Sequence, residues 1–173
     1  KRIAQVPTIA ATIHRPRKGE EVPDPRPDLT FAKSFLYLFN GRVPDRAEAD
    51  VMHRIMILHA DHGFNASTFA CRVVAGTGSD MYSAITGGIG ALRGPKHGGA
   101  NEVAFEVQKR YDSPDDAEAD VRRRVENKEV VIGFGHPVYT VSDPRNVVIK
   151  GVAQRLSQAA GSTKMYDIAE RLE

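Results

Sequence analysis

Apolar side chains recur at intervals of three and four residues along most of this sequence, and this spacing constrains the fold more than any other feature. Between residues 28 and 40 the interval is kept by six side chains and a glycine follows: Leu29, Phe31, Ala32, Phe35, Leu36, Phe39 and then Gly41. That pattern predicts an amphipathic helix with a glycine stop. Similar spacing predicts helices after Pro44, over 101–111, over 114–127 and after Asp143. The chain is therefore expected to be all-α.

Two stretches depart from the helical spacing. Residues 1–14 alternate only weakly. The stretch that follows contains Pro16, Pro23, Pro25 and Pro27, which exclude a continuous helix, so we expect this proline-rich stretch to be a loop. The run Val130-Val131-Ile132 is the one short strand-like segment.

Small residues dominate two further segments, 67–75 and 80–92. In the second, Gly87, Gly88, Gly90 and Ala91 lack bulky side chains. Since small side chains let helices approach closely, we expect these segments deep inside the fold or at a subunit contact. A core within one monomer and an interface between two monomers remain open at this point.

Charge and composition exclude several classes of protein. A length of 173 residues corresponds to about one domain. With 24 Lys and Arg against 22 Asp and Glu, the net charge of +2 gives no nucleic-acid footprint. The triplet Arg122-Arg123-Arg124 is flanked by acidic residues, so it is interpreted as a solvated helix face. No run is long and apolar enough to cross a membrane, and a single cysteine, Cys71, excludes an internal disulfide. A cytoplasmic or matrix-like location is expected.

The two ends suggest a piece of a longer chain. The sequence opens at Lys1 without Met and closes on a helical pattern without a stop signal.

Two histidines lie in turns that are rich in glycine and proline, where a backbone can approach a ligand closely. His97 precedes Gly98-Gly99, which opens a helix, and free N–H groups there would favour a neutral imidazole that donates a hydrogen bond. The alternative is a structural turn histidine. His136 precedes Tyr139, Asp143 and Arg145, a set suited to holding a small carboxylate, although a structural Asp-Pro-Arg turn fits equally well.

Other chemistries receive less support. His59 and His62, with Asp61 between them, could share a helix face as metal ligands, but the sequence has no Cys pair and no His-Glu-x-x-His motif, so we predict no metal. The run Gly87-Gly88-Ile89-Gly90 lacks the spacing of a dinucleotide-binding loop, and no Gly-x-Ser-x-Gly motif is present.

Three motifs together resemble the citrate synthase family: LHADHGFNASTF at 58–69, GPKHGGANE at 94–102 and GFGHPVYTVSDPR at 133–145. Within that family, SDMYSAITGGIGALRGPKHGGANE and RVENKEVVIGFGHPVY look most like bacterial 2-methylcitrate synthases. The resemblance implies a Claisen-type condensation of propionyl-CoA with oxaloacetate and water, giving 2-methylcitrate and CoA in propionate catabolism. Citrate synthase, using acetyl-CoA, and a non-catalytic oxaloacetate-binding homologue are the alternatives.

The resemblance also implies a role for each matching residue. His97 would hydrogen-bond the thioester carbonyl and stabilise the enol, and His136 would polarise the oxaloacetate carbonyl. His62 and Arg145 would hold the carboxylates of oxaloacetate. The remaining assignments are substrate binding by Asn65, support of the pocket by Ser67 and His59, and contact with the coenzyme A adenine by the backbone of Val130, Val131 and Gly133.

The family further implies how the chain is organised. Residues 1–127 would form part of a large helical domain, and residues 128–173 the crossover and the start of a small acyl-CoA-binding domain. The general base, an Asp, would lie beyond this chain, so the segment alone is not expected to turn over. A bacterial cytoplasmic homodimer is implied, with coenzyme A thioester as a substrate and no permanent cofactor.

One departure concerns the acyl group. Bacterial methylcitrate synthases often have Tyr-Ala-Glu-His where this chain has His59-Ala60-Asp61-His62, and the His form also occurs in true citrate synthases. The acyl preference is thus less constrained than the reaction class, and the remaining sequence favours propionyl-CoA.

Overall fold

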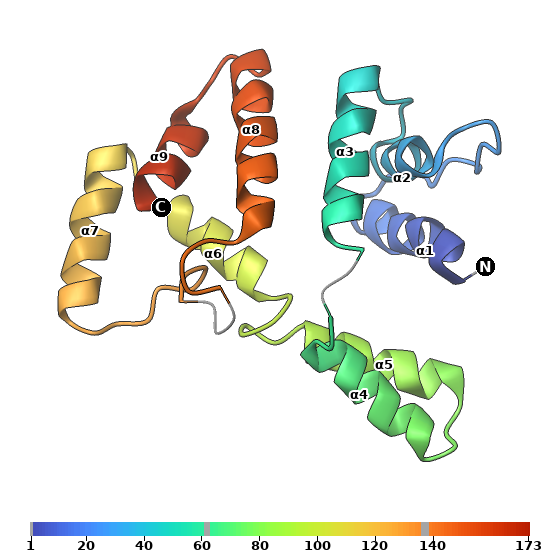
Figure 1. The fold of residues 1–173 in the computed structure, drawn as a ribbon. Coiled ribbons are helices and arrows are strands. Elements are labelled where there is room, and N and C mark those ends of the chain that lie inside the picture. The colour runs from blue at the N-terminus through green and yellow to red at the C-terminus, as the bar shows by residue number, and fades with distance from the viewer. Residues whose placement is uncertain (1, 61–62, 136–138) are drawn as a thin grey trace. The chain divides into compact units, whose positions relative to one another are not determined.

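The computed structural model describes residues 2–60, 63–135 and 139–173. Over these ranges every regular element is an α-helix and no strand is present, which confirms the all-α prediction (Figure 1). The same ranges contain no helix with the length and apolar character that crossing a membrane requires. The chain divides into two compact units, residues 1–61 and residues 62–173.

The first unit begins with helix α1 (Arg2–Arg17), and the proline-rich stretch after it is a loop over residues 18–30, as predicted except at Pro16. The helix includes Pro16, which disfavours helix locally, but packing compensates. Ala11 is fully buried, and the His14 ring stacks on Phe39 with 3.9 Å between the ring centroids. Tertiary contacts therefore outweigh a weak local pattern.

The next two helices begin and end where their local signals predict. Helix α2 (Phe31–Asn40) stops at Gly41, whose φ of 75° is left-handed and favours glycine. Helix α3 (Arg46–Leu58) starts at Asp45, which exchanges two hydrogen bonds with Glu48 in a capping box. These caps satisfy backbone groups that the helix ends leave unpaired.

The second unit opens with two helices packed along each other, α4 (Ala66–Gly76) and α5 (Met81–Leu92). They cross very closely at Gly88. A Cβ atom on this residue would lie 2.2 Å from Sγ of Cys71 and 3.3 Å from the carbonyl oxygen of Ser67. The close helix approach predicted from the small residues is thus present, and α4 and α5 of one chain make it.

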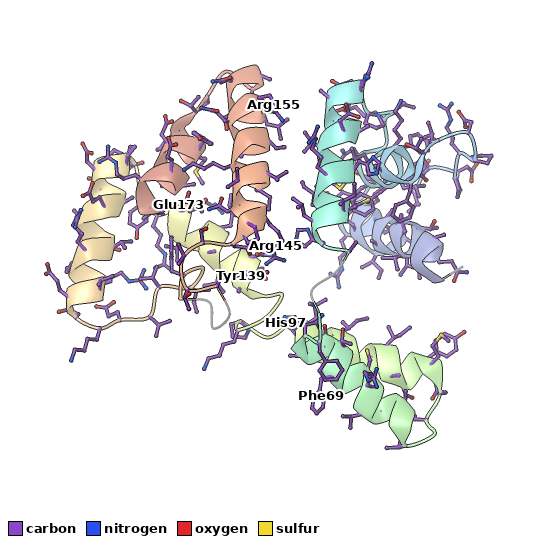
Figure 2. The ribbon with its side chains drawn as sticks, in the orientation of Figure 1. Phe69, His97, Tyr139, Arg145, Arg155 and Glu173 are labelled. Atoms are coloured by element: carbon purple, nitrogen blue, oxygen red, sulfur yellow. The ribbon has the colours of Figure 1, made fainter. Side chains whose placement is uncertain are left out.

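Large apolar side chains cover the outer surface of the α4–α5 pair. Each is at least 44% exposed: Phe69, Val73, Met81, Tyr82, Ile85, Ile89 and Leu92. Figure 2 shows Phe69 extending away from α4. Exposed apolar side chains gathered on one helix pair are typical of an interaction site.

The remaining helices are α6 (Ala100–Gln108), α7 (Pro114–Glu126), α8 (Pro144–Ala159) and α9 (Lys164–Leu172) (Figure 1). A small core joins α6, α7 and α9, formed by Val107, Tyr111, Ala117 and Ile168 with Leu172 against them. Arg171 of α9 adds ion pairs to Asp115 and Glu118 of α7, at 2.7 and 2.9 Å. These contacts hold the first turns of α7 against α9.

The strand-like run 130–132 is a loop, so that prediction is wrong. Helix α7 ends with Lys128 in the left-handed region, at φ 57°. The Lys128 N–H donates to the Val125 carbonyl at 2.9 Å, and the Glu129 N–H donates to the Arg124 carbonyl at 2.8 Å. This is a Schellman ending. Since no strand lies alongside in the described residues, the run takes its conformation from the helix end.

Candidate active site around His97

The first turn of α4 is capped by Asn65. Its Oδ1 accepts the Thr68 N–H at 2.9 Å and lies 2.7 Å from the Ser67 hydroxyl. Asparagine is favoured here because its side chain satisfies a backbone donor that the helix leaves unpaired. The neighbouring donor in the same turn, the Ser67 N–H, points to a different acceptor.

That acceptor is the imidazole of His97 (Figure 2). The Ser67 N–H donates to Nε2 of His97 at 3.3 Å, and the Ser67 Oγ lies 2.9 Å from the same nitrogen. Residues 30 positions apart in the sequence therefore meet at the start of α4. The structure brings Asn65, Ser67 and His97 together as one hydrogen-bonded group.

These contacts assign the ring proton of His97. A backbone N–H cannot reverse its role, so Nε2 accepts from Ser67 and the proton lies on Nδ1. The Ser67 hydroxyl has one hydrogen, which points either to Nε2 or to Asn65 at a given moment. In this arrangement Nδ1–H is the donor that the imidazole offers to a ligand.

The turn that presents His97 folds back onto the end of α5. The His97 N–H donates to the Gly94 carbonyl at 2.9 Å, and the Gly99 N–H reaches the Leu92 carbonyl at 3.2 Å. A Cβ atom on Gly98 would lie 2.6 Å from the Leu92 side chain, and one on Gly99 would lie 2.4 Å from a carbonyl oxygen of the turn. Only glycine fits at these two positions, so the Gly-Gly pair fixes where the imidazole sits.

The helix N-terminus at the imidazole belongs to α4. The sequence predicts free N–H groups at the helix that opens after Gly98-Gly99, which is α6. In the structure the Ala100 N–H bonds to the His97 carbonyl at 3.0 Å, and the Asn101 N–H bonds to the Gly98 carbonyl at 3.4 Å. The idea of a helix N-terminus is right, but the helix chosen is wrong, because α6 satisfies its first donors within its own turn.

A second group of polar side chains lies at the start of α8. Asp143 caps this helix by accepting the Arg145 N–H at 2.9 Å, and its carboxylate accepts from the Arg145 guanidinium at 2.5–3.0 Å. The guanidinium carbon lies 5.7 Å from the centre of the Tyr139 ring (Figure 2). The Asp143 hydrogen bond raises the pKa of Arg145. A guanidinium held in this way has a fixed orientation, which suits a planar carboxylate.

Three of the predicted site positions lie outside the described residues or in the first unit. His62 and His136 lie outside the described residues. His59 ends α3 in the first unit, is exposed, and its Nδ1 lies 2.8 Å from the Ile55 carbonyl oxygen. In the described ranges, no three His, Cys, Asp or Glu side chains gather as a metal site would require.

The loop predicted to meet adenine approaches α6. Val131 is buried whereas Val130 is 75% exposed. Gly133 has a φ of 107°, and a Cβ atom there would lie 3.2 Å from Cβ of Ala104. The loop is therefore held against the protein at Val131 and Gly133 and exposed to solvent at Val130.

Sequence reasoning misses one residue behind this loop, Arg124. The interpretation of the arginine triplet as a solvated face fits Arg122 and Arg123, whose side chains are 73% and 59% exposed. It is wrong for Arg124, which is 14% exposed. The signal was available, because Arg124 lies seven residues after the buried Ala117 and so shares its helix face.

Comparison with known proteins matches the whole chain to one family. The family model for the citrate synthase C-terminal domain covers residues 1–173. Citrate synthase 2 of Bacillus subtilis (strain 168) is 44% identical over 170 residues, 98% of this chain and 46% of that protein. The 2-methylcitrate synthase of Mycobacterium tuberculosis (strain H37Rv) is 41% identical over 170 residues, with 98% and 43% covered.

Solved structures give the same fold. The citrate synthase of Thermoplasma acidophilum, in a ternary complex with carboxymethyl coenzyme A and oxaloacetate, superposes with a TM-score of 0.90. It is 38% identical, and the match covers 96% of this chain and 44% of that one. The chain thus spans a little under half the length of the relatives it matches.

Proposed function

Because this chain belongs to the citrate synthase family, we propose that it is part of an enzyme that condenses an acyl-coenzyme A thioester with oxaloacetate. One observation carries the proposal: His97 rests its Nε2 on the first turn of α4 and so offers Nδ1–H as a fixed donor. Loss of the proton next to a thioester carbonyl places negative charge on the carbonyl oxygen. A preorganised donor at that oxygen stabilises the enol as it forms.

The remaining steps follow from the chemistry. The enol carbon attacks the ketone carbon of oxaloacetate, the new carbon–carbon bond forms, and the ketone oxygen takes a proton. In our proposal His136 polarises this ketone, while His62 and Arg145 hold the carboxylates. Water then cleaves the thioester and releases coenzyme A as a thiol. In this proposal the base that removes the first proton is not a residue of this chain.

For the acyl donor we propose propionyl-CoA, which would make the whole protein a 2-methylcitrate synthase. The motif resemblance over 79–102 and 124–139 supports this choice. Acetyl-CoA is the second candidate, because His59 matches the form found in citrate synthases and relatives of both kinds lie at 44% and 41% identity.

We also propose that the whole protein is a cytoplasmic homodimer that contacts its second copy through the outer surface of α4 and α5. The exposed apolar side chains of this surface support the proposal. Within each copy, we propose a domain boundary between residues 127 and 128. Sedimentation of the full-length protein, with Phe69→Glu as the variant and Val147→Glu on the exposed face of α8 as control, tests the dimer. The dimer proposal fails if Phe69→Glu leaves the dimer intact.

The function is tested by oxaloacetate-dependent thiol release from the full-length polypeptide, with propionyl-CoA and acetyl-CoA compared side by side. Faster release with propionyl-CoA supports the proposed donor, and faster release with acetyl-CoA supports the second candidate. Oxaloacetate binding without thiol release from either donor would reject an enzyme in favour of a binding homologue.

A further inference from the structure

Arg124 differs from its two neighbours in what it contacts. Arg122 pairs with Glu118 along the exposed surface of α7, and Arg123 bonds Asp120 and also lies 3.4 Å from the Glu129 carboxylate. The Arg124 side chain is instead covered and extends toward the loop that follows the helix. Its Nη2 donates to the Val130 carbonyl at 3.1 Å.

A second contact ties the same side chain to the residue before. Nε of Arg124 lies 3.4 Å from the carboxylate of Glu129. Nη1 is buried and makes no hydrogen bond to any residue that the structure describes. The guanidinium thus holds two consecutive loop residues, one by its carboxylate and one by its backbone.

Burial makes these contacts interdependent. A covered guanidinium is costly unless it is paired and hydrogen-bonded. If Glu129 and Val130 moved away, Arg124 would lose its ion pair and its carbonyl acceptor in the loop and keep only its electrostatic interactions with Asp120 and Tyr111. Loop displacement therefore carries the cost of these two lost contacts in addition to the loss of the Schellman hydrogen bonds.

The hydrogen bond to Val130 also sets the direction of the next peptide. In a planar trans peptide the C=O and N–H point to opposite sides. Since the Val130 carbonyl points to Arg124, the Val131 N–H points away from it. An adenine ring offers both acceptors and donors on its edges, so a fixed pattern of backbone groups can recognise it.

We propose that Arg124 is a positioning residue for the acyl-coenzyme A substrate: it holds residues 129–131 so that the backbone of Val130, Val131 and Gly133 meets adenine. This inference rests on the proposed function, because that function supplies the coenzyme A ligand. Arg124 itself lies behind the loop, bonded to the carbonyl of Val130.

The experiment uses the full-length protein and two thioesters of the same acyl group, acyl-CoA and acyl-pantetheine, which lacks the nucleotide. Arg124→Ala should raise KM for acyl-CoA about tenfold with kcat largely kept, because it removes a charge-assisted hydrogen bond. Its kcat/KM for acyl-pantetheine should stay unchanged. Arg124→Lys should give an intermediate KM, since one ammonium group serves only one of the two contacts well.

Arg122→Ala is the matched control, because that side chain lies in the same turn and pairs only along α7. Arg122→Ala should change neither KM for acyl-CoA nor kcat/KM for acyl-pantetheine. If Arg124→Ala does not fold, Arg124→Met keeps the side-chain stem without its donors. Hydrogen exchange at amides 129–133 should speed up in the Arg124 variant and not in the Arg122 variant.

Two results would overturn the inference: an unchanged KM for acyl-CoA in the Arg124 variants, or an equal loss with both thioesters. Absence of thiol release from the wild-type protein would instead reject the proposed function. In that case the calorimetric affinity for coenzyme A, compared between wild type and Arg124→Ala, still decides the role of Arg124, with weaker binding supporting it and equal binding rejecting it.

Discussion

The contact between α4 and α5 predicts that one added methyl group at Gly88 destabilises the protein. Alanine normally stabilises a helix interior relative to glycine by about 1 kcal/mol. At this position, however, the new Cβ would lie 2.2 Å from Sγ of Cys71, far inside the ordinary contact distance of at least 3.4 Å. The carbonyl oxygen of Ser67, at 3.3 Å, blocks relief by a small sideways shift because it belongs to the backbone.

Overpacking of this kind costs about 1–3 kcal/mol, and a contact as short as this one favours the upper half of that range. After the gain in helix propensity is subtracted, Gly88→Ala should lose roughly 1–2 kcal/mol net. For a protein of this size that lowers the midpoint of thermal unfolding by about 2–8 °C. The matched control is Gly151→Ala in α8, where no atom lies within 4 Å of the new Cβ. It should be neutral or raise the midpoint, because only the helix propensity changes.

A double variant isolates the cause. Cys71→Ala removes the sulfur, leaving its own Cβ at 3.9 Å and the Ser67 carbonyl oxygen at 3.3 Å as the nearest atoms. Adding Gly88→Ala to that background should therefore cost much less than it does in wild type. The reasoning is refuted if Gly88→Ala unfolds at or above the wild-type midpoint, or if it costs the same with and without the sulfur.

Four other outcomes are expected. His97→Ala in the full-length protein should lower kcat at least about 100-fold while oxaloacetate affinity by calorimetry stays within about twofold, and near-normal turnover would contradict the role of this residue. Arg145→Ala should weaken oxaloacetate binding at least about tenfold, with unchanged affinity counting against it. Lys128→Gly should stabilise by about 0.5–1 kcal/mol, since glycine adopts the left-handed φ of 57° without steric cost, and a lower unfolding midpoint would contradict this. The Glu48 carboxyl should titrate with a pKa of about 2 by NMR, because it accepts hydrogen bonds from the Arg42 guanidinium and from the backbone of Asp45, and Arg42→Ala should raise this pKa. The stability that this ionised carboxyl contributes to the fold is fully present above pH 4.5 and is lost as the pH falls through 2.

Local signals predict most helices well, because their ends are encoded in single residues. Gly41 stops α2 as predicted, and in the structure Asp45 caps α3 and Ser113 caps α7. Helix α1 carries no such signal. It forms because Ala11 and His14 pack against the rest of the first unit, which no local pattern reveals.

For the candidate site, sequence reasoning finds the residues but not all of their partners. It identifies His97 and Ser67, and the structure joins them through the N-terminal turn of α4. It places the relevant helix N-terminus at α6 because that helix is the neighbour in sequence. It treats Arg124 as solvated because the charge pattern hides the face that the side chain shares with Ala117. A contact across 30 residues accounts for the position of His97, whereas the partners of Arg124 lie within six residues of it in the sequence.

The turn after α5 and the first turn of α4 together determine the position of the His97 imidazole. The end of α5 holds the backbone of the turn that carries His97, and Ser67 of α4 binds the ring nitrogen Nε2. The spacing of the two helices, set by the fit of Gly88 against Cys71, therefore decides where Nδ1 lies. A substitution that changes this spacing would therefore move the imidazole donor without replacing His97 or Ser67.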